Sequence, residues 1–255
     1  MVELKNKVCN AHIKREHKEA LEKLSKIAEN KSYLFLPFKG IRDEIFNEFS
    51  EFKLRLFSTS PKTLVLEDLD FRIVFKIIYI NNLKHRLSGF FENKGLKIYR
   101  LSQYFRKKNI KIAEVLGYGK FLKNPFYVVP KMKGESFLEI AKRNDKNVLE
   151  LFYKIIDEII KIHKEGYFIG DANIKHFFFL NCEVEGIIDL DCFKKVYFLK
   201  KNRFCRDIGY LLRPELHLSK EEIRKLVSYY SGIMMFNHTN VLTKIEYYRA
   251  KRWKN

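Results

Sequence analysis

The sequence predicts an α+β fold in two lobes, with a small mixed sheet in the N-terminal half and mainly helices in the C-terminal half. Short β-rich runs separated by turn residues fill residues 63–132, and longer segments with apolar residues at helical spacing follow Gly134. The 255 residues are 46% hydrophobic, which is enough to bury a core in each lobe. We therefore expect an N-terminal helical extension over 1–55, an N-lobe over 56–133 and a C-lobe over 134–255.

The N-terminal extension carries two helical patterns. Residues 8–30 place apolar residues such as Leu24 at helical spacing against a charged outer face, and residues 42–54 show a similar pattern after Gly40. The segment Ser58–Pro61 that follows is a strong turn signal. We expect the strands of the sheet to begin after it.

The remaining elements follow from the alternation of strand-forming and helix-forming segments. Thr63–Leu66 and Arg72–Ile78 flank an acidic turn and predict a hairpin, while Gly166 ends the longest helical pattern. The other predicted elements are a helix over 93–107, strands over 115–119 and 126–132, helices over 137–143 and 147–164, a hairpin formed by 177–180 and 184–190, and helices from Arg206 onward.

Charge and cysteine content limit the classes of partner. Lysine and arginine outnumber aspartate and glutamate by 50 to 31, and the net charge of +19 favours anionic partners such as phosphates, nucleic acid or acidic lipid. The four cysteines show no C-x-x-C spacing, which predicts reduced thiols rather than a zinc site or disulfides. Because no signal-peptide core and no run of about 18 apolar residues is present, we expect a cytoplasmic protein that does not span a membrane.

Two aspartates on either side of the predicted 177–190 hairpin indicate the chemistry. Asp171 precedes this hairpin and Asp189 ends it. Phosphoryl transfer needs one carboxylate at the acceptor hydroxyl and another that holds magnesium on the nucleotide phosphates. A lysine from the sheet completes the arrangement, and Lys76 lies within a predicted strand that a helix follows. Each residue alone is more typical of a turn, a cap or an edge strand, but together they favour a kinase.

Four pieces of the chain, within roughly residues 57–215, carry a resemblance to a known family. They are FSTSPKT, RIVFKII around Lys76, HKEGYFIGDANIKHFFFLNCEVEGIIDLD, and RDIGYLL at Arg206–Leu212. In this order they resemble the lipopolysaccharide core heptose kinases, within the lipopolysaccharide kinase family and the protein-kinase-like superfamily. The resemblance implies a two-lobed protein-kinase-like fold and an ATP-dependent kinase that phosphorylates a sugar of the lipopolysaccharide core, heptose being the expected acceptor.

The resemblance also implies roles for individual residues. Asp171 would be the catalytic acid or base, Asp189 would bind magnesium, and Lys76 would contact the α and β phosphates of ATP. Asp207 would hold the backbone of the catalytic loop. The backbone of the connection between the lobes, at Pro130, Lys131 and Met132, would meet the adenine.

Three positions depart from the usual kinase pattern. His176 stands where kinases carry a magnesium-binding asparagine, and because imidazole suits softer ions than magnesium, we treat it as a metal position that would tolerate Mn²⁺ as well as Mg²⁺. The helix over 93–107 contains no acidic residue, so the usual glutamate partner of the strand lysine is missing unless Glu92, just before the helix, takes its place. The turn before Thr63 is not glycine-rich.

Two further residues of this segment have alternative roles. Asp191 is either a second metal ligand or, more simply, a partner of Lys194 or Lys195. His163 is interpreted either as a cap that bonds the last carbonyls of its helix, the favoured role, or as a residue that packs under the catalytic loop.

Alternatives to a sugar kinase remain open. The departures at His176 and in the 93–107 helix are compatible with a pseudokinase or scaffold, and the motifs do not exclude a kinase for a protein or another small molecule. A nucleic-acid binder would rest on charge alone, so no specific nucleic acid is expected. The expected partners are the lipopolysaccharide core oligosaccharide and an anionic membrane surface, which places the protein in the cytoplasm, peripheral to the inner membrane.

Overall fold

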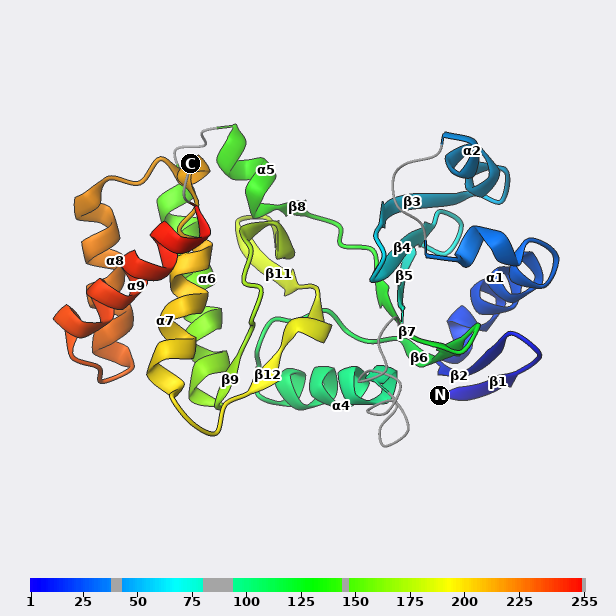
Figure 1. The fold of residues 1–255 in the computed structure, drawn as a ribbon, viewed down its shortest axis with the longest axis horizontal. Coiled ribbons are helices and arrows are strands. Elements are labelled where there is room, and N and C mark those ends of the chain that lie inside the picture. The colour runs from blue at the N-terminus through cyan, green and yellow to red at the C-terminus, as the bar shows by residue number, and fades with distance from the viewer. Residues whose placement is uncertain (38–42, 80–93, 144–146, 254–255) are drawn as a thin grey trace. The chain divides into compact units, whose positions relative to one another are not determined.

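The computed structural model describes residues 1–37, 43–79, 94–143 and 147–253, which belong to two compact units (Figure 1). Unit 1 comprises Met1–Tyr104 and Ala113–Lys131, and unit 2 comprises Phe105–Ile112 and Met132–Asn255. The last of the three points at which the chain changes unit, after Lys131, lies near the expected end of the N-lobe at residue 133. The assignment of Phe105–Ile112 to unit 2 was not predicted.

Unit 1 is built on a seven-stranded sheet in the order β1-β2-β6-β7-β5-β4-β3, and every described pairing in it is antiparallel. The hairpin predicted around the acidic turn is present as β4 and β5. The strands are β1 (Val2–Lys5), β2 (Cys9–Ile13), β3 (Leu54–Thr59), β4 (Thr63–Asp68), β5 (Ile73–Ile78), β6 (Gly117–Phe121) and β7 (Asn124–Pro130). The helical elements are η1 (Arg15–His17), α1 (Lys18–Asn30), η2 (Ser32–Phe35), α2 (Asp43–Glu51) and α4 (Lys94–Lys107). The last three residues of α4 are counted with unit 2, and this helix confirms the one predicted over 93–107.

The structure corrects two predictions for the N-terminal segment. Residues 8–30 do not form one helix, because the Cys9–Ile13 segment alternates buried and exposed side chains with the period of a strand. This strand, β2, pairs with β6 through Ala11 and Gly119, so the N-terminal segment contributes strands to the sheet of unit 1 and is not a separate helical extension. The second predicted helix also ends early, since Leu54 already begins β3.

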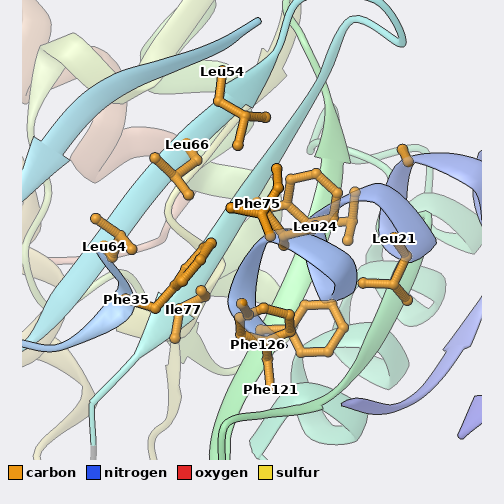
Figure 2. Close-up of a cluster of buried hydrophobic side chains, with 14 of the residues drawn as sticks. Leu21, Leu24, Phe35, Leu54, Leu64, Leu66, Phe75, Ile77, Phe121 and Phe126 are labelled. Atoms are coloured by element: carbon orange, nitrogen blue, oxygen red, sulfur yellow. The ribbon is translucent and has the colours of Figure 1, made fainter. Parts of the chain in front are cut away.

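The core of unit 1 lies on one face of the sheet. Leu21 and Leu24 of α1 pack toward Phe75 of β5 and Phe126 of β7 (Figure 2), and these side chains belong to one buried cluster. Burying such side chains is the main free-energy gain of folding. Because neighbouring residues of a strand point to opposite faces, Lys76 projects away from this core.

Unit 2 is mainly helical. Its central helix α6 buries one apolar face, and the helix and hairpin predicted on either side of Gly166 are confirmed. The helical elements are α5 (Phe137–Lys142), α6 (Val148–Lys164), η3 (Ile174–His176), η4 (Leu190–Cys192), α7 (Lys200–Leu211), η5 (Pro214–Leu216), α8 (Lys220–Ile233) and α9 (His238–Arg252). The strands are β8 (Glu135–Ser136), β9 (Tyr167–Phe168), β10 (Phe177–Leu180), β11 (Glu183–Ile187) and β12 (Lys194–Lys195), in sheets of order β11-β10-β8 and β12-β9.

The helices α7 and α9 pack closely at Gly209. A Cβ atom at this position would lie 2.8 Å from the carbonyl oxygen of Ile245 and 3.0 Å from the amide nitrogen of Arg249. The Arg249 side chain also donates from Nε to the carbonyl oxygen of Leu212 at 3.1 Å. The absence of a side chain at Gly209 therefore lets the C-terminal half of α9 lie against α7.

Among the described residues, every helix is too short or too polar to span a membrane.

Candidate active site

The loop between β9 and η3, which carries Asp171, is held by the buried carboxylate of Asp207. Asp207 lies on α7 and is fully buried. Its two carboxylate oxygens accept hydrogen bonds from the amides of Ile169, at 2.6 Å, and Gly170, at 3.1 Å. Charge-assisted bonds of this kind fix a loop more firmly than neutral ones. This is the bonding that the resemblance implied for Asp207.

His163 extends this network and takes the second of its two expected roles, under the catalytic loop, rather than the favoured role of helix cap. Its ring is buried, with Nε2 3.3 Å from a carboxylate oxygen of Asp207 and Nδ1 2.9 Å from the hydroxyl of Tyr230. Because Asp207 can only accept, Nε2 carries the proton and the Tyr230 hydroxyl donates to Nδ1. Burial lowers the pKa of His163, partly offset by the hydrogen bond to Asp207, so the imidazole is held neutral.

Gly170 allows the loop to approach the segment after Asp189. Its φ of +82° is in the left-handed region that favours glycine. A Cβ atom there would also lie 2.8 Å from the carbonyl oxygen of Cys192. Both features require glycine at the position immediately before Asp171.

Asp171 is half-exposed and ion-paired. Its Oδ1 accepts a hydrogen bond of 2.8 Å from Nη2 of Arg252, which lies in the last turn of α9. No motif in the sequence connects these two residues. The packing at Gly209 brings the end of α9 to the catalytic loop, so the pair is a product of the tertiary structure.

Two further arginines lie on aromatic side chains next to Arg252. The Arg252 guanidinium lies 5.0 Å from the centre of the Tyr210 ring, and that of Arg206 lies 5.7 Å from the same ring. Arg213 lies 4.5 Å from the Trp253 ring and also pairs with Glu215. We call Arg206, Arg213 and Arg252 the arginine cluster.

Within this cluster, one N–H group of the Arg206 side chain can still donate a hydrogen bond. Its Nε is buried and has no hydrogen-bond partner among residues 1–37, 43–79, 94–143 and 147–253. Its Nη2 lies 3.9 Å from the position that a Cβ on Gly170 would occupy, so the guanidinium is close to the catalytic loop. A buried donor without a partner is costly, and an acceptor group supplied by a ligand would satisfy it.

Asp189 lies in a group of potential metal ligands that the sequence analysis only partly predicted. One ligand atom from each of Asp189, Asp191 and Cys192 lies within 4.8 Å of the other two. Two carboxylates suit magnesium, which prefers oxygen ligands, whereas the Cys192 thiol does not. That thiol instead donates to Asp189 Oδ2 at 3.2 Å. The left-handed backbone of Asp189, with φ of 70°, is the kind of strain that functional sites hold.

His176 lies beside Asp189 but is not a member of this ligand group. Its Nε2 is 3.9 Å from Asp189 Oδ2, and its side chain is buried. The backbone is held as well, because the amide of Ile188 donates to the carbonyl oxygen of His176 at 2.9 Å. The imidazole is therefore within ion-pair distance of the Asp189 carboxylate.

Unit 1 carries Lys76, the residue that the resemblance assigned to the α and β phosphates of ATP. Lys76 is half-buried in the middle of β5, opposite Val65 of β4 and Tyr127 of β7. Its side chain projects from the face opposite the core. Glu92, the glutamate just before the 93–107 helix, lies outside the described residues.

In the segment predicted to meet the adenine, Pro130–Met132, two of the three residues have no backbone amide available to donate a hydrogen bond to a base. Pro130 has no amide hydrogen, and the Lys131 amide donates to the carbonyl oxygen of Arg72 at 2.9 Å. The Lys133 amide donates to the carboxylate of Glu185 at 2.9 Å. A base that takes a hydrogen bond from this segment therefore takes it from Met132, while the carbonyl groups remain as acceptors.

Two of the comparisons with known proteins give no match: no protein-family model and no curated protein corresponds to this sequence. The third comparison finds solved structures whose folds are similar to that of this chain. An aminoglycoside phosphotransferase, APH(3'')-Id from Streptomyces rimosus, matches with a TM-score of 0.51 and 10% identity over 77% of this chain and 93% of its own. The bifunctional kinase-methyltransferase WbdD matches with a TM-score of 0.50 and 10% identity over 76% of this chain and 46% of its own, so this chain spans about half of WbdD. These similarities confirm the predicted protein-kinase-like fold.

Proposed function

We propose that this protein is an ATP-dependent kinase that phosphorylates a hydroxyl of a lipopolysaccharide core sugar, heptose being the expected acceptor. The observation that carries the proposal is the placement of Asp171 and Asp189 within unit 2. They flank the β10–β11 hairpin, and Asp207 fixes the loop that presents Asp171. The kinase-like fold supports the reaction class, and the acceptor rests on the sequence resemblance.

Asp171 is the proposed catalytic residue. Its carboxylate is half-exposed, so an acceptor hydroxyl can reach it, and its position is fixed through the amide of the preceding Gly170. A carboxylate at this point orients the hydroxyl and accepts its proton as the bond to phosphorus forms. Positioning and charge neutralisation carry most of the catalysis of phosphoryl transfer.

The carboxylates of Asp189 and Asp191 are the proposed ligands of magnesium, which when bound neutralises charge on the transferred phosphoryl group. Lys76 is the proposed contact of unit 1 with the α and β phosphates. The Met132 amide is the proposed hydrogen-bond donor to the adenine, because the amides of Lys131 and Lys133 already donate to other groups of the protein.

The arginine cluster supports an acceptor that carries an anionic group near the reacting hydroxyl. Guanidinium groups bind phosphate and carboxylate in paired hydrogen bonds, and Arg252 is in direct contact with Asp171. Arg206 adds a buried donor without a partner in the described part of the chain. A core sugar with a phosphate or carboxylate substituent provides the missing acceptor atoms.

Incubation of the purified protein with magnesium ATP and core oligosaccharide tests this function. We expect ADP formation that depends on the oligosaccharide and a product with one added phosphate. Asp171→Ala should bind magnesium ATP normally and transfer phosphate about a hundredfold more slowly or worse, since general acid–base catalysis contributes about that much. Wild-type protein that binds ATP but phosphorylates no core sugar would refute the acceptor, and an active Asp171→Ala variant would refute the catalytic role.

A pseudokinase is the second candidate, and one observation favours it. The ion pair with Arg252 occupies a carboxylate oxygen that the proposed mechanism uses. A scaffold would keep this pair and bind nucleotide without turnover. Turnover of wild type and Arg252→Ala separates the two: a kinase transfers phosphate as wild type and loses acceptor affinity in Arg252→Ala, whereas a pseudokinase binds nucleotide and transfers no phosphate in either protein.

A further inference from the structure

The connection between β12 and α7 exposes three consecutive large apolar side chains. Tyr197, Phe198 and Leu199 are 72%, 86% and 71% exposed, and the described part of the chain contains no other run of this kind. Contiguous apolar surface in water is unfavourable and typically marks a place where a partner binds. We call Tyr197–Leu199 the apolar tip, which Figure 1 shows in yellow just before the first turn of α7.

The apolar tip is held from both ends. Before it, β12 pairs with β9, and the buried Val196 donates its amide hydrogen to the carbonyl oxygen of Gly166 at 2.8 Å. After it, α7 begins at Lys200, and Leu199 itself has a left-handed backbone with φ of 54°. A leucine adopts this conformation only at a cost, so the surrounding structure imposes it. The tip is therefore a preformed projection.

Basic residues surround the apolar tip on both sides. Residues 193–206 contain no aspartate or glutamate. The cations of this segment next to the tip are Lys194, Lys195, Lys200, Lys201 and Arg203, of which all but the partly exposed Lys201 are exposed. An apolar projection with basic residues on both sides of it matches a surface that is negatively charged outside and apolar beneath.

A second apolar residue lies next to the same region. Lys201 Nζ is 5.9 Å from the centre of the Phe236 ring, which places the α8–α9 connection beside the first turn of α7. In that connection Met235 is 93% exposed, with φ of 53°. Aliphatic and aromatic side chains are thus presented together with lysines.

We propose that the apolar tip inserts into the interfacial region of an anionic lipid bilayer while the flanking lysines contact the headgroups. Amphipathic segments bind such surfaces by combining buried apolar area with attraction to anionic lipid. Tyrosine favours this interfacial depth because its ring is apolar and its hydroxyl is polar. Charge complementarity argues against a second copy of this chain as the occupant, because a two-fold contact would bring the flanking basic residues of the two copies together. The proposal does not depend on phosphoryl transfer.

Cosedimentation with lipid vesicles tests the proposal on the whole protein. Wild type should bind phosphatidylcholine vesicles that contain about a third phosphatidylglycerol, bind pure phosphatidylcholine vesicles more weakly, and lose affinity at high salt. The tip variant Tyr197→Ser, Phe198→Ser, Leu199→Asn should bind the anionic vesicles at least about tenfold more weakly. Asparagine is chosen at position 199 because it tolerates the left-handed conformation.

Two control variants separate the effect of the apolar tip on vesicle binding from the effects of positive charge and of exposed apolar residues elsewhere. Removal of three separate exposed leucines, in Leu36→Ser, Leu69→Ser, Leu180→Ser, should leave vesicle binding unchanged. Lys200→Gln with Lys201→Gln should weaken binding to anionic vesicles by about fivefold for each lysine and leave binding to pure phosphatidylcholine unchanged. Circular dichroism should show that all variants keep the wild-type fold.

Insertion itself is measured by fluorescence quenching with brominated lipids. Phe198→Trp should be quenched in anionic vesicles, while the single tryptophan of the wild type, Trp253, serves as the reference. The proposal is overturned if wild type does not bind anionic vesicles, if the tip variant binds as wild type does, or if tryptophan at 198 is not quenched. It is also overturned if the tip variant instead abolishes self-association or binding to single-stranded RNA without a change in vesicle binding.

Discussion

The guanidinium of Arg252 donates a hydrogen bond of 2.8 Å to the carboxylate of Asp171, although 81 residues separate them in the sequence. The close packing of α7 and α9 at Gly209 makes this contact possible. The residue that we propose as the base is therefore already bound to a cation from the last turn of α9. This relationship makes Arg252 the natural residue for recognition of an anionic acceptor.

We predict that Arg252→Ala raises the KM for the acceptor about tenfold or more while leaving the affinity for magnesium ATP unchanged. The reason is the loss of a charge-assisted hydrogen bond to the acceptor, which contributes roughly 1.5–3 kcal/mol. Steady-state kinetics with core oligosaccharide and calorimetry with ATP measure the two quantities. Arg252→Lys should recover part of the loss, because lysine keeps the charge without the paired geometry.

Gly209→Ala provides an independent check of the same relationship. An added methyl group would contact the backbone of α9 and displace the helix, together with Arg252, without a change in any charged residue. It should therefore raise the acceptor KM in the same direction as Arg252→Ala. Normal acceptor KM in both variants would exclude Arg252 from acceptor binding.

Asp189→Asn should abolish the magnesium dependence of ATP binding, because it removes an anionic ligand from the carboxylate pair. Calorimetric titration with ATP, with and without magnesium, measures the effect. Asp191→Asn is the matched variant and should weaken magnesium-dependent binding as well. If only Asp189→Asn has an effect, Asp191 is not a ligand, and if neither has an effect, the proposed magnesium site is wrong.

His176→Asn tests the departure from the usual kinase pattern. Asparagine offers an oxygen ligand, so we expect magnesium-supported activity that is equal to or higher than in wild type and a smaller preference for manganese. Turnover of both proteins with each cation gives the comparison. Lower activity with both cations would show that the imidazole, 3.9 Å from Asp189, serves a role other than metal binding.

Acidification should destabilise the protein through His163. Burial lowers the pKa of this histidine, so the neutral form contributes stability that is fully present above the unfolded-state pKa of about 6.5. As the pH falls below that value the unfolded chain takes up a proton that the folded chain does not. The free energy of unfolding then decreases by up to about 1.4 kcal/mol per pH unit until the folded-state pKa is passed.

Chemical denaturation at a series of pH values measures this dependence. His163→Gln cannot titrate and should show a correspondingly smaller decrease over the same range, even if its overall stability is lower. Equal slopes for the two proteins would contradict the assignment of a neutral buried His163.

The parts of the fold that sequence reasoning predicted are those with strong local patterns. The helix α6 has regular apolar spacing and ends before Gly166, and the β4–β5 hairpin has a clear turn. The N-terminal segment was mispredicted because the strand Cys9–Ile13 is short and carries polar residues that also fit a helical surface. Its pairing with β6, far along the chain, decides its structure, and such pairing leaves no local signal.

The residues of the candidate site likewise divide into those that a sequence pattern indicates and those that only tertiary packing brings to the site. Asp171, Asp189 and Asp207 were predicted because their order along the chain follows a recognisable pattern, and the structure places all three in unit 2. Arg252 was missed because only the packing of two helices brings it to Asp171. Asp191 was assigned mainly to surface pairing, since sequence spacing alone does not show that η4 turns its carboxylate toward Asp189.

Mass spectrometry of core oligosaccharide tests the central claim most directly. Oligosaccharide is compared from cells with the intact gene, cells without it, and cells that carry only Asp171→Ala. The account predicts that one phosphate on a core sugar is present with the intact gene and absent in the other two. Identical phosphorylation in all three would contradict the proposed reaction on lipopolysaccharide core.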